Sequence, residues 1–238
     1  MIERSRHIAA EADRFAAALD GIDPSTPVPT CPDWAAGDLL KHLTEVHQFW
    51  AAVIGDRLTG AAVGEFEENR PQLSDDPAEM QGLRRRATAD LLAALESRVP
   101  DEEAWSWSEA DQSVDFTWRM QTHEATMHRV DAELTAGEEI SPIDPQVAGE
   151  GIDHVLDVMW NWAPEDAERT VGGVVELRAT DSGRTWQVSA VRWTGQAWGQ
   201  TFTDQPTGAR TEGQTPTQRS PVRRRTSTCS SGTAPTRG

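Results

Sequence analysis

The chain has 238 residues, enough for one large domain or two small ones, and carries a net charge of −17 at pH 7. This charge argues against non-specific nucleic-acid binding, which needs a basic surface, and against binding to anionic membranes. Two distant cysteines, Cys31 and Cys229, give neither a disulfide framework nor a cysteine zinc cluster.

The sequence also bears on the location of the protein. No window approaches the length of a transmembrane span. The first residues lead into an amphipathic helix without the apolar segment of a signal peptide. The sequence therefore predicts a cytoplasmic protein.

Apolar residues recur with helical spacing over five segments. They predict helices at residues 2–20, 34–54, 76–98, 116–136 and 144–162. The proline-rich segment 23–29 predicts an extended connector, and the Gly- and acid-rich segment 58–76 predicts a loop. After the fifth helix the period changes, and residues 174–180 and 185–191 predict two strands joined by a turn.

These elements predict a mainly α fold with two domains. The first, residues 1–139, is a four-helix bundle, and the second, residues 140–203, is a small and incomplete α+β domain. Residues 204–238 are rich in Thr, Ser, Pro, Arg and Gly, and predict a disordered tail.

The basic tail contrasts with the acidic remainder of the chain. A natural flexible tail is one interpretation. We favour a frameshift, because regrouping the bases of GC-rich codons for residues 215–233 allows a strand, a turn and an amphipathic helix. An unfinished α+β domain needs such elements.

Two predicted helices carry metal-competent side chains where apolar core residues are expected. Glu124 and His128 are four residues apart, so they stack on one helix face. His42 interrupts the apolar stripe of another helix. One carboxylate and two imidazoles that meet inside a bundle form a three-ligand metal site with room for water or substrate.

Structural roles compete with this interpretation. A lone helical His is more often a satisfied core or surface residue, and Glu/His pairs at this spacing also occur on surfaces. The pattern is not a metalloprotease helix, whose histidines are four apart, because His123 and His128 are five apart. His47 is likewise five residues from His42 and is predicted to lie off its face.

Other residues near these segments have two open roles each. Gln121 and Asp131 continue the polar stripe and are candidates to orient a metal ligand, whereas Asp131 pairing with Arg129 or a neighbouring helix is the alternative. Cys31 is expected to pack at a helix entrance rather than to act as a nucleophile. Most of the ten Trp residues are expected in the core.

Two segments resemble a known family. Residues 30–34 (TCPDW), followed by residues 38–43 (DLLKHL), resemble the entrance to the second helix of the mycothiol-dependent maleylpyruvate isomerase family of actinobacteria. Residues 124–133 (EATMHRVDAE) resemble the second motif of that family. The likeness extends from residue 1 to about residue 200 and implies a DinB-like metal-binding four-helix bundle.

The resemblance implies a site and two cofactors. It implies zinc held by His42, Glu124 and His128, and mycothiol as the thiol cofactor. The same donors also suit Ni, Co, Mn or Fe. No arginine for a substrate carboxylate from the end of the family's C-terminal unit is matched in this chain.

The implied function is an isomerase or thiol transferase, in which a metal-activated thiolate adds to a small electrophilic substrate. Its partners are that substrate and a low-molecular-weight thiol. Two alternatives remain: a non-catalytic metal- or thiol-binding bundle that acts as a sensor or interaction module, and an inactive truncated product.

Overall fold

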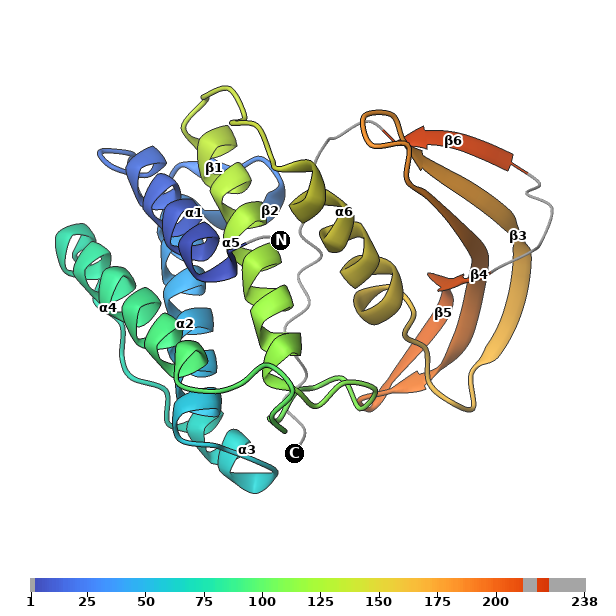
Figure 1. Cartoon of the computed structure of the whole chain (residues 1–238), viewed down its shortest axis with the longest axis horizontal. Helices are drawn as coiled ribbons and strands as arrows, with labels where there is room; N and C mark the ends of the chain where they lie inside the picture. The colour runs from blue at the N-terminus through green and yellow to red at the C-terminus, as the bar shows by residue number, and fades with distance from the viewer. Residues whose placement is uncertain (1–2, 212–217, 223–238) are drawn as a thin grey trace. The chain divides into compact units, whose positions relative to one another are not determined.

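A computed structural model describes residues 3–211 and 218–222 of the chain (Figure 1). The described residues form two compact units, divided between Ile143 and Asp144. The predicted boundary lies after residue 139, and the assignment of the two units as separate domains stays a prediction.

Four long helices form the first unit (Figure 1). They are α1 (Arg4–Ala18), α2 (Ala36–Gly55), α4 (Pro77–Glu96) and α5 (Val114–Thr135). α2 packs against α4 and α5, and α1 packs against α5 and α4. The predicted four-helix bundle is therefore confirmed.

Local sequence signals set the starts of two of these helices. The carboxylate of Asp76 accepts a hydrogen bond from the backbone N–H of Glu79 at 2.8 Å, and Pro77 occupies the first helical position of α4. The hydroxyl of Ser113 accepts from the N–H of Phe116 at 3.1 Å at the start of α5. Both caps satisfy N–H groups that a helix start leaves unpaired.

A short hairpin precedes α2. Its strands are β1 (Pro27–Val28) and β2 (Cys31–Ala35), which pair antiparallel. The N–H of Ala35 donates to the carboxylate of Asp38 at 2.9 Å, and this hydrogen bond caps the start of α2. The helix therefore begins two residues after the predicted start at Trp34.

The predicted loop at residues 58–76 is partly wrong, because α3 (Ala61–Glu68) lies within it. Val63 is buried, and the ring of Phe66 lies 6.0 Å from the ring of Phe49 on α2. These two apolar side chains give a Gly- and acid-rich segment a face to bury.

Apolar side chains from the hairpin and all four long helices make the core of this unit. The cluster consists of Phe15, Ala18, Leu19, Val28, Cys31, Ala36, Leu39, Leu40, Leu43, Met80 and Ala132. Burying one Leu or Phe side chain stabilises the fold by roughly 1.5–3 kcal/mol. Turning a helix about its axis would expose its members of this cluster to water, so the cluster fixes the rotation of each helix.

The second unit pairs a helix with a sheet. α6 (Pro145–His154) continues as the π-helical turn η1 (Val155–Met159). The strands are β3 (Glu168–Ala179), β4 (Thr185–Ala197), β5 (Gln200–Arg210) and β6 (Gln218–Val222), in the sheet order β5-β4-β3-β6. β6 runs parallel to β3, and the other neighbours are antiparallel.

The predicted strand–turn–strand is present as β3 and β4, and both strands are longer than expected. Gly183 in the turn between them has a φ of +71°, a conformation that favours glycine. Leu156 packs against Trp186 and Val188. The indole N–H of Trp186 donates to Asp153 at 2.8 Å, so η1 and α6 are tied to β4.

The predicted disorder from residue 204 onward is wrong for residues 204–210, which complete β5. These residues pair with β4, and Thr207 and Gly208 are buried. Residues 218–222 form β6. Residues 212–217 and 223–238 of the predicted tail lie outside the described residues, and the frameshift stays a hypothesis about the gene.

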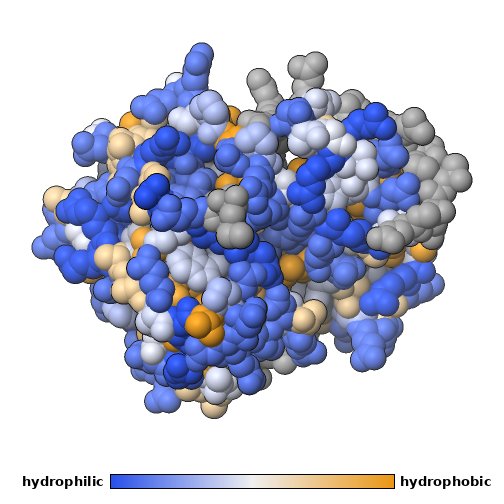
Figure 2. Space-filling view, viewed as in Figure 1, coloured by the Kyte–Doolittle hydropathy of each residue, from blue (hydrophilic) through white to orange (hydrophobic). Residues whose placement is uncertain are grey.

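Hydrophilic residues predominate on the face shown in Figure 2, and apolar residues form small separate patches there. Among the described residues, no helix combines the length and apolar character that crossing a membrane requires.

Candidate metal centre

The structure brings His42, Glu124 and His128 together. One ligand-competent atom from each side chain lies within 4.8 Å of those of the other two. His42 comes from α2, and the other two come from α5, more than eighty residues away along the chain. The bundle thus assembles the predicted cluster from two distant segments.

Helix packing explains why these three side chains meet. α2 and α5 run in opposite directions (Figure 1), so the first half of α2 faces the second half of α5. Leu39 and Leu43 are fully buried on either side of His42. Ala125 and Ala132 on α5 are fully buried too, which sets the rotation of that helix.

The distances within the cluster suit a metal ion. The Nε2 atom of His128 lies 3.1 Å from an Oε atom of Glu124. Two ligands of a tetrahedral ion with bonds of about 2.1 Å lie roughly 3.4 Å apart. The rings of His42 and His128 lie 4.8 Å apart at an angle of 78°, so the His42 ring meets that of His128 edge to face.

A further carboxylate orients His128 from behind. Nδ1 of His128 lies 3.0 Å from Oδ2 of Asp131, which is almost fully buried. The hydroxyl of Thr30 donates to the other oxygen of Asp131 at 2.6 Å. Of the two roles open for Asp131, the structure thus shows contact with a ligand candidate, while Arg129 donates to Glu11 and Glu133.

Burial and nearby charges shift the pKa values of the three groups differently. Burial lowers the pKa of His42 to about 4, with help from the nearby His128 charge. Burial alone favours a neutral His128, but hydrogen bonds to Asp131 and Glu124 outweigh it and raise its pKa to about 9. Burial opposes ionisation of Glu124, yet the hydrogen bond and charge of His128 lower its pKa to about 2.

These shifts define the electrostatics of the centre at neutral pH. His42 is neutral and offers a lone pair, and Glu124 is ionised. His128 holds a positive charge between the carboxylates of Glu124 and Asp131. A divalent cation can replace that proton, because the two carboxylates already favour positive charge at this place.

Trp34 is a residue at the centre that sequence reasoning missed. Its ring lies 4.7 Å from the ring of His42 and 6.3 Å from that of His128. Most Trp residues were expected in the core, whereas Trp34 is partly exposed beside the cluster. Its position in the segment 30–34, which resembles a motif of a known family, is the sequence signal that could have placed it near the cluster.

The remaining candidates lie outside the cluster. Among the described residues, the group of side chains that can hold a metal includes neither His47 nor His123. Nδ1 of His47 instead lies 2.9 Å from the hydroxyl of Thr88, inside the bundle. Cys31 is buried in the apolar core, as predicted.

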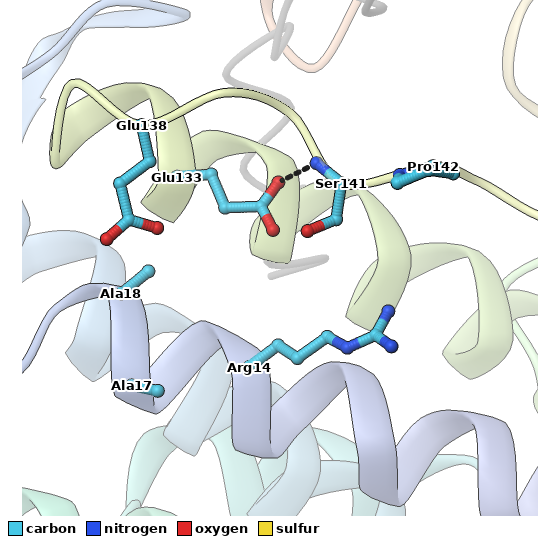
Figure 3. Close-up of a pocket in the computed structure, with 7 residues that line it drawn as sticks. All are labelled: Arg14, Ala17, Ala18, Glu133, Glu138, Ser141 and Pro142. Atoms are coloured by element: carbon cyan, nitrogen blue, oxygen red, sulfur yellow. Dashed lines mark hydrogen bonds between the residues drawn. The ribbon is translucent and has the colours of Figure 1, made fainter.

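A separate cavity of about 470 Å³ lies between α1 and the segment that follows α5 (Figure 3). The carboxylates of Glu133 and Glu138 and the guanidinium group of Arg14 surround it. Ser141 donates its backbone N–H to Glu133 at 2.9 Å. None of the residues that line this cavity belongs to the metal-competent cluster.

Comparison with known proteins assigns the family. Residues 5–133, more than half of the chain, match the family model described as the mycothiol maleylpyruvate isomerase N-terminal domain. The chain belongs to this family. The matched region contains all three residues of the metal-competent cluster.

Two solved structures are also similar to this member of the family. They are crystal structures of the mycothiol-dependent maleylpyruvate isomerase and of a point mutant of it, with TM-scores of 0.48 and 0.49. Each is 14% identical to this chain, and each match covers 77% of this chain and 78% of the other. No curated protein matches.

Proposed function

We propose that the chain is a zinc- and mycothiol-dependent enzyme of the maleylpyruvate isomerase type. In this proposal a metal-activated thiolate adds to a small electrophilic substrate, for cis–trans isomerisation or thiol transfer. The observation that carries it is the convergence of His42, Glu124 and His128 in a member of this family. We place the activity in the cytoplasm, where thiols stay reduced.

The donor set fits zinc. Two imidazole nitrogens and one carboxylate are borderline ligands that suit this ion, and three protein ligands leave a fourth position free for a thiol or water. The hydrogen bond that Nδ1 of His128 donates to Asp131 resembles the carboxylate–histidine pairs that orient zinc ligands. The same donors accept other divalent metals, and zinc is the choice that the experiment below tests.

The bound metal supplies one effect, which is a lower pKa for a thiol at its free position. The residues of the chain do the rest. Glu124 and His128 would hold the ion from one face of α5, and His42 would hold it from α2. Asp131 holds the His128 ring so that Nε2 points toward Glu124. The ring of Trp34 packs against one side of His42, with the ring centres 4.7 Å apart.

Turnover measurements test this proposal. The full chain, purified without chelators and loaded with zinc, is incubated with maleylpyruvate or another small electrophile, with and without mycothiol. We expect turnover that needs both zinc and mycothiol and that His42→Ala abolishes. The matched variant His123→Ala removes an imidazole outside the cluster and retains turnover.

The alternatives give different results. Zinc binding without thiol-dependent turnover would favour the non-catalytic metal-binding bundle and overturn the enzymatic proposal. Neither zinc binding nor turnover in a folded protein would favour an inactive product.

A further inference from the structure

A polar stripe runs along the inner face of α5. Its members, spaced alternately by four and three residues, are Thr117, Gln121, Glu124, His128 and Asp131. This spacing places side chains in the core of a bundle, where apolar residues are the norm. Glu124, His128 and Asp131 belong to the metal centre. Thr117 and Gln121 have no role there, although neither has any exposed surface.

His47 is fully buried on α2, the helix that packs against α5. Because the helices are antiparallel, moving five residues beyond His42, about 7.5 Å along α2, leads toward the start of α5. Gln121 lies one turn in the same direction from Glu124. His47 and Gln121 are therefore displaced from the metal centre in the same direction along the bundle.

The hydrogen bonds of Thr88 define the tautomer of His47. The Thr88 hydroxyl donates its single hydrogen to the carbonyl of Arg84 at 3.0 Å. It therefore accepts from Nδ1 of His47 at 2.9 Å. His47, which is fully buried, thus carries its proton on Nδ1 and presents a lone pair on Nε2.

Four polar atoms remain without a protein partner at this place. Within the described part of the chain, Nε2 of His47, Oγ1 of Thr117 and both amide atoms of Gln121 are buried and have no hydrogen-bond partner. Native proteins rarely leave buried polar groups unpaired, because the desolvation cost exceeds the gain from an ordinary hydrogen bond. We therefore expect these atoms to have a partner that the protein chain does not supply.

We propose that His47, Thr117 and Gln121 line an internal water site between α2 and α5, directly beyond the metal centre. A water molecule both donates and accepts, so it matches this mixed set. It donates to Nε2 of His47 and to the amide oxygen of Gln121, and it accepts from the amide nitrogen or from Thr117. Buried waters with two to four polar partners are stable parts of a fold.

This site does not depend on the proposed function. The unpaired atoms lie outside the metal-competent cluster, and water binds them with or without a metal ion. Failure of the water site would leave the metal centre untouched, and the reverse also holds.

A crystal structure of the full chain at about 1.5 Å resolution tests the proposal. We expect at least one ordered water within 3.2 Å of Nε2 of His47 and of the Gln121 amide. A direct hydrogen bond between Gln121 and His47, without water between them, would overturn it.

The tautomer gives a second test that needs no variant. Long-range ¹H–¹⁵N correlation spectra of the native protein distinguish the two nitrogens of His47. We expect the proton on Nδ1 and an unprotonated Nε2 in a neutral ring. A proton on Nε2 would contradict the acceptor role that the water site requires.

Replacement of Gln121 distinguishes a site that holds a water molecule from a site that holds none. Gln121→Met keeps the length of the side chain and removes its hydrogen bonds. With a bound water we expect the Tm to fall and the water to disappear from the crystal structure. A higher Tm would show that Gln121 was unpaired and would overturn the proposal. Thr122→Val, which removes a buried hydroxyl bonded to the Trp118 carbonyl, sets the scale for one lost hydrogen bond.

Discussion

Nδ1 of His128 lies 3.0 Å from Oδ2 of Asp131, three residues further along the same helix. The hydroxyl of Thr30 holds the other oxygen of Asp131, so the carboxylate is fixed from two sides. This contact turns Nε2 of His128 toward Glu124 and His42. It is the relationship on which the orientation of the candidate centre depends.

Asp131→Asn should weaken zinc binding by roughly 10–100-fold, the usual cost of losing a group that orients a metal ligand. The amide has no charge to support the His128 ring and accepts a hydrogen bond more weakly. Competition with a chromophoric chelator measures the affinity. Asp115→Asn, on the same helix but paired with Arg4 and Arg119, serves as the control. Equal affinities for the two variants would refute the role of Asp131.

Arg129→Ala should lower the free energy of unfolding by about 3–5 kcal/mol. The fully buried guanidinium group donates to Glu11 and Glu133 at 2.7 Å each, and both carboxylates are at most 5% exposed. Removing it takes the buried cation from both carboxylates, so that Glu11 keeps only the exposed Arg14 and Glu133 keeps only the N–H of Ser141. Denaturant unfolding measures the loss.

The control for this substitution is Arg119→Ala on the same helix. Arg119 pairs with Asp111 and Asp115 but is 34% exposed. Water screens such a pair, so its loss should cost less than about 1 kcal/mol. Similar losses for the two variants would show that burial does not set the contribution of the Arg129 network.

His47 should make the fold sensitive to acid. Burial, together with the positive charge of Arg84, lowers its pKa from 6.5 to about 3. The unfolded state therefore binds one more proton between these values, so stability is complete above pH 6.5 and falls as the pH drops toward 3. Between pH 7 and pH 5 this proton linkage lowers the free energy of unfolding by about 2 kcal/mol.

Comparison with His47→Gln isolates that contribution, because other titrating groups remain in both proteins. His128 acts in the opposite direction, since its raised pKa of about 9 contributes stability below pH 6.5 that is lost toward pH 9. We expect the variant to lose about 2 kcal/mol less than the native chain between pH 7 and pH 5. Equal losses would mean that His47 is not buried in its neutral form.

Local signals explain which features the sequence could predict. Pro77 after Asp76 marks the start of α4 through contacts within four residues, whereas the Ser113 cap starts α5 two residues before the predicted Phe116. Glu124 and His128 share a face because of helical geometry alone. His42 stood out because it interrupts an apolar stripe, although its meeting with α5 required the bundle.

Features that depend on distant partners were not predictable in the same way. α3 packs Phe66 against Phe49 on α2. Residues 204–210 continue β5 because they pair with β4. Trp34 lies beside the rings of His42 and His128 because it belongs to β2 of the β1–β2 hairpin. Likewise, Thr30 and Asp131 are more than a hundred residues apart, and no local pattern connects them.

Anomalous diffraction at the zinc edge tests the central claim most directly. Crystals of the native chain, purified without chelators and supplied with zinc, should show one anomalous peak within about 2.3 Å of His42, Glu124 and His128. The peak should vanish after chelator treatment and in crystals of His128→Ala. Well-ordered crystals with no peak among these three side chains would contradict the account.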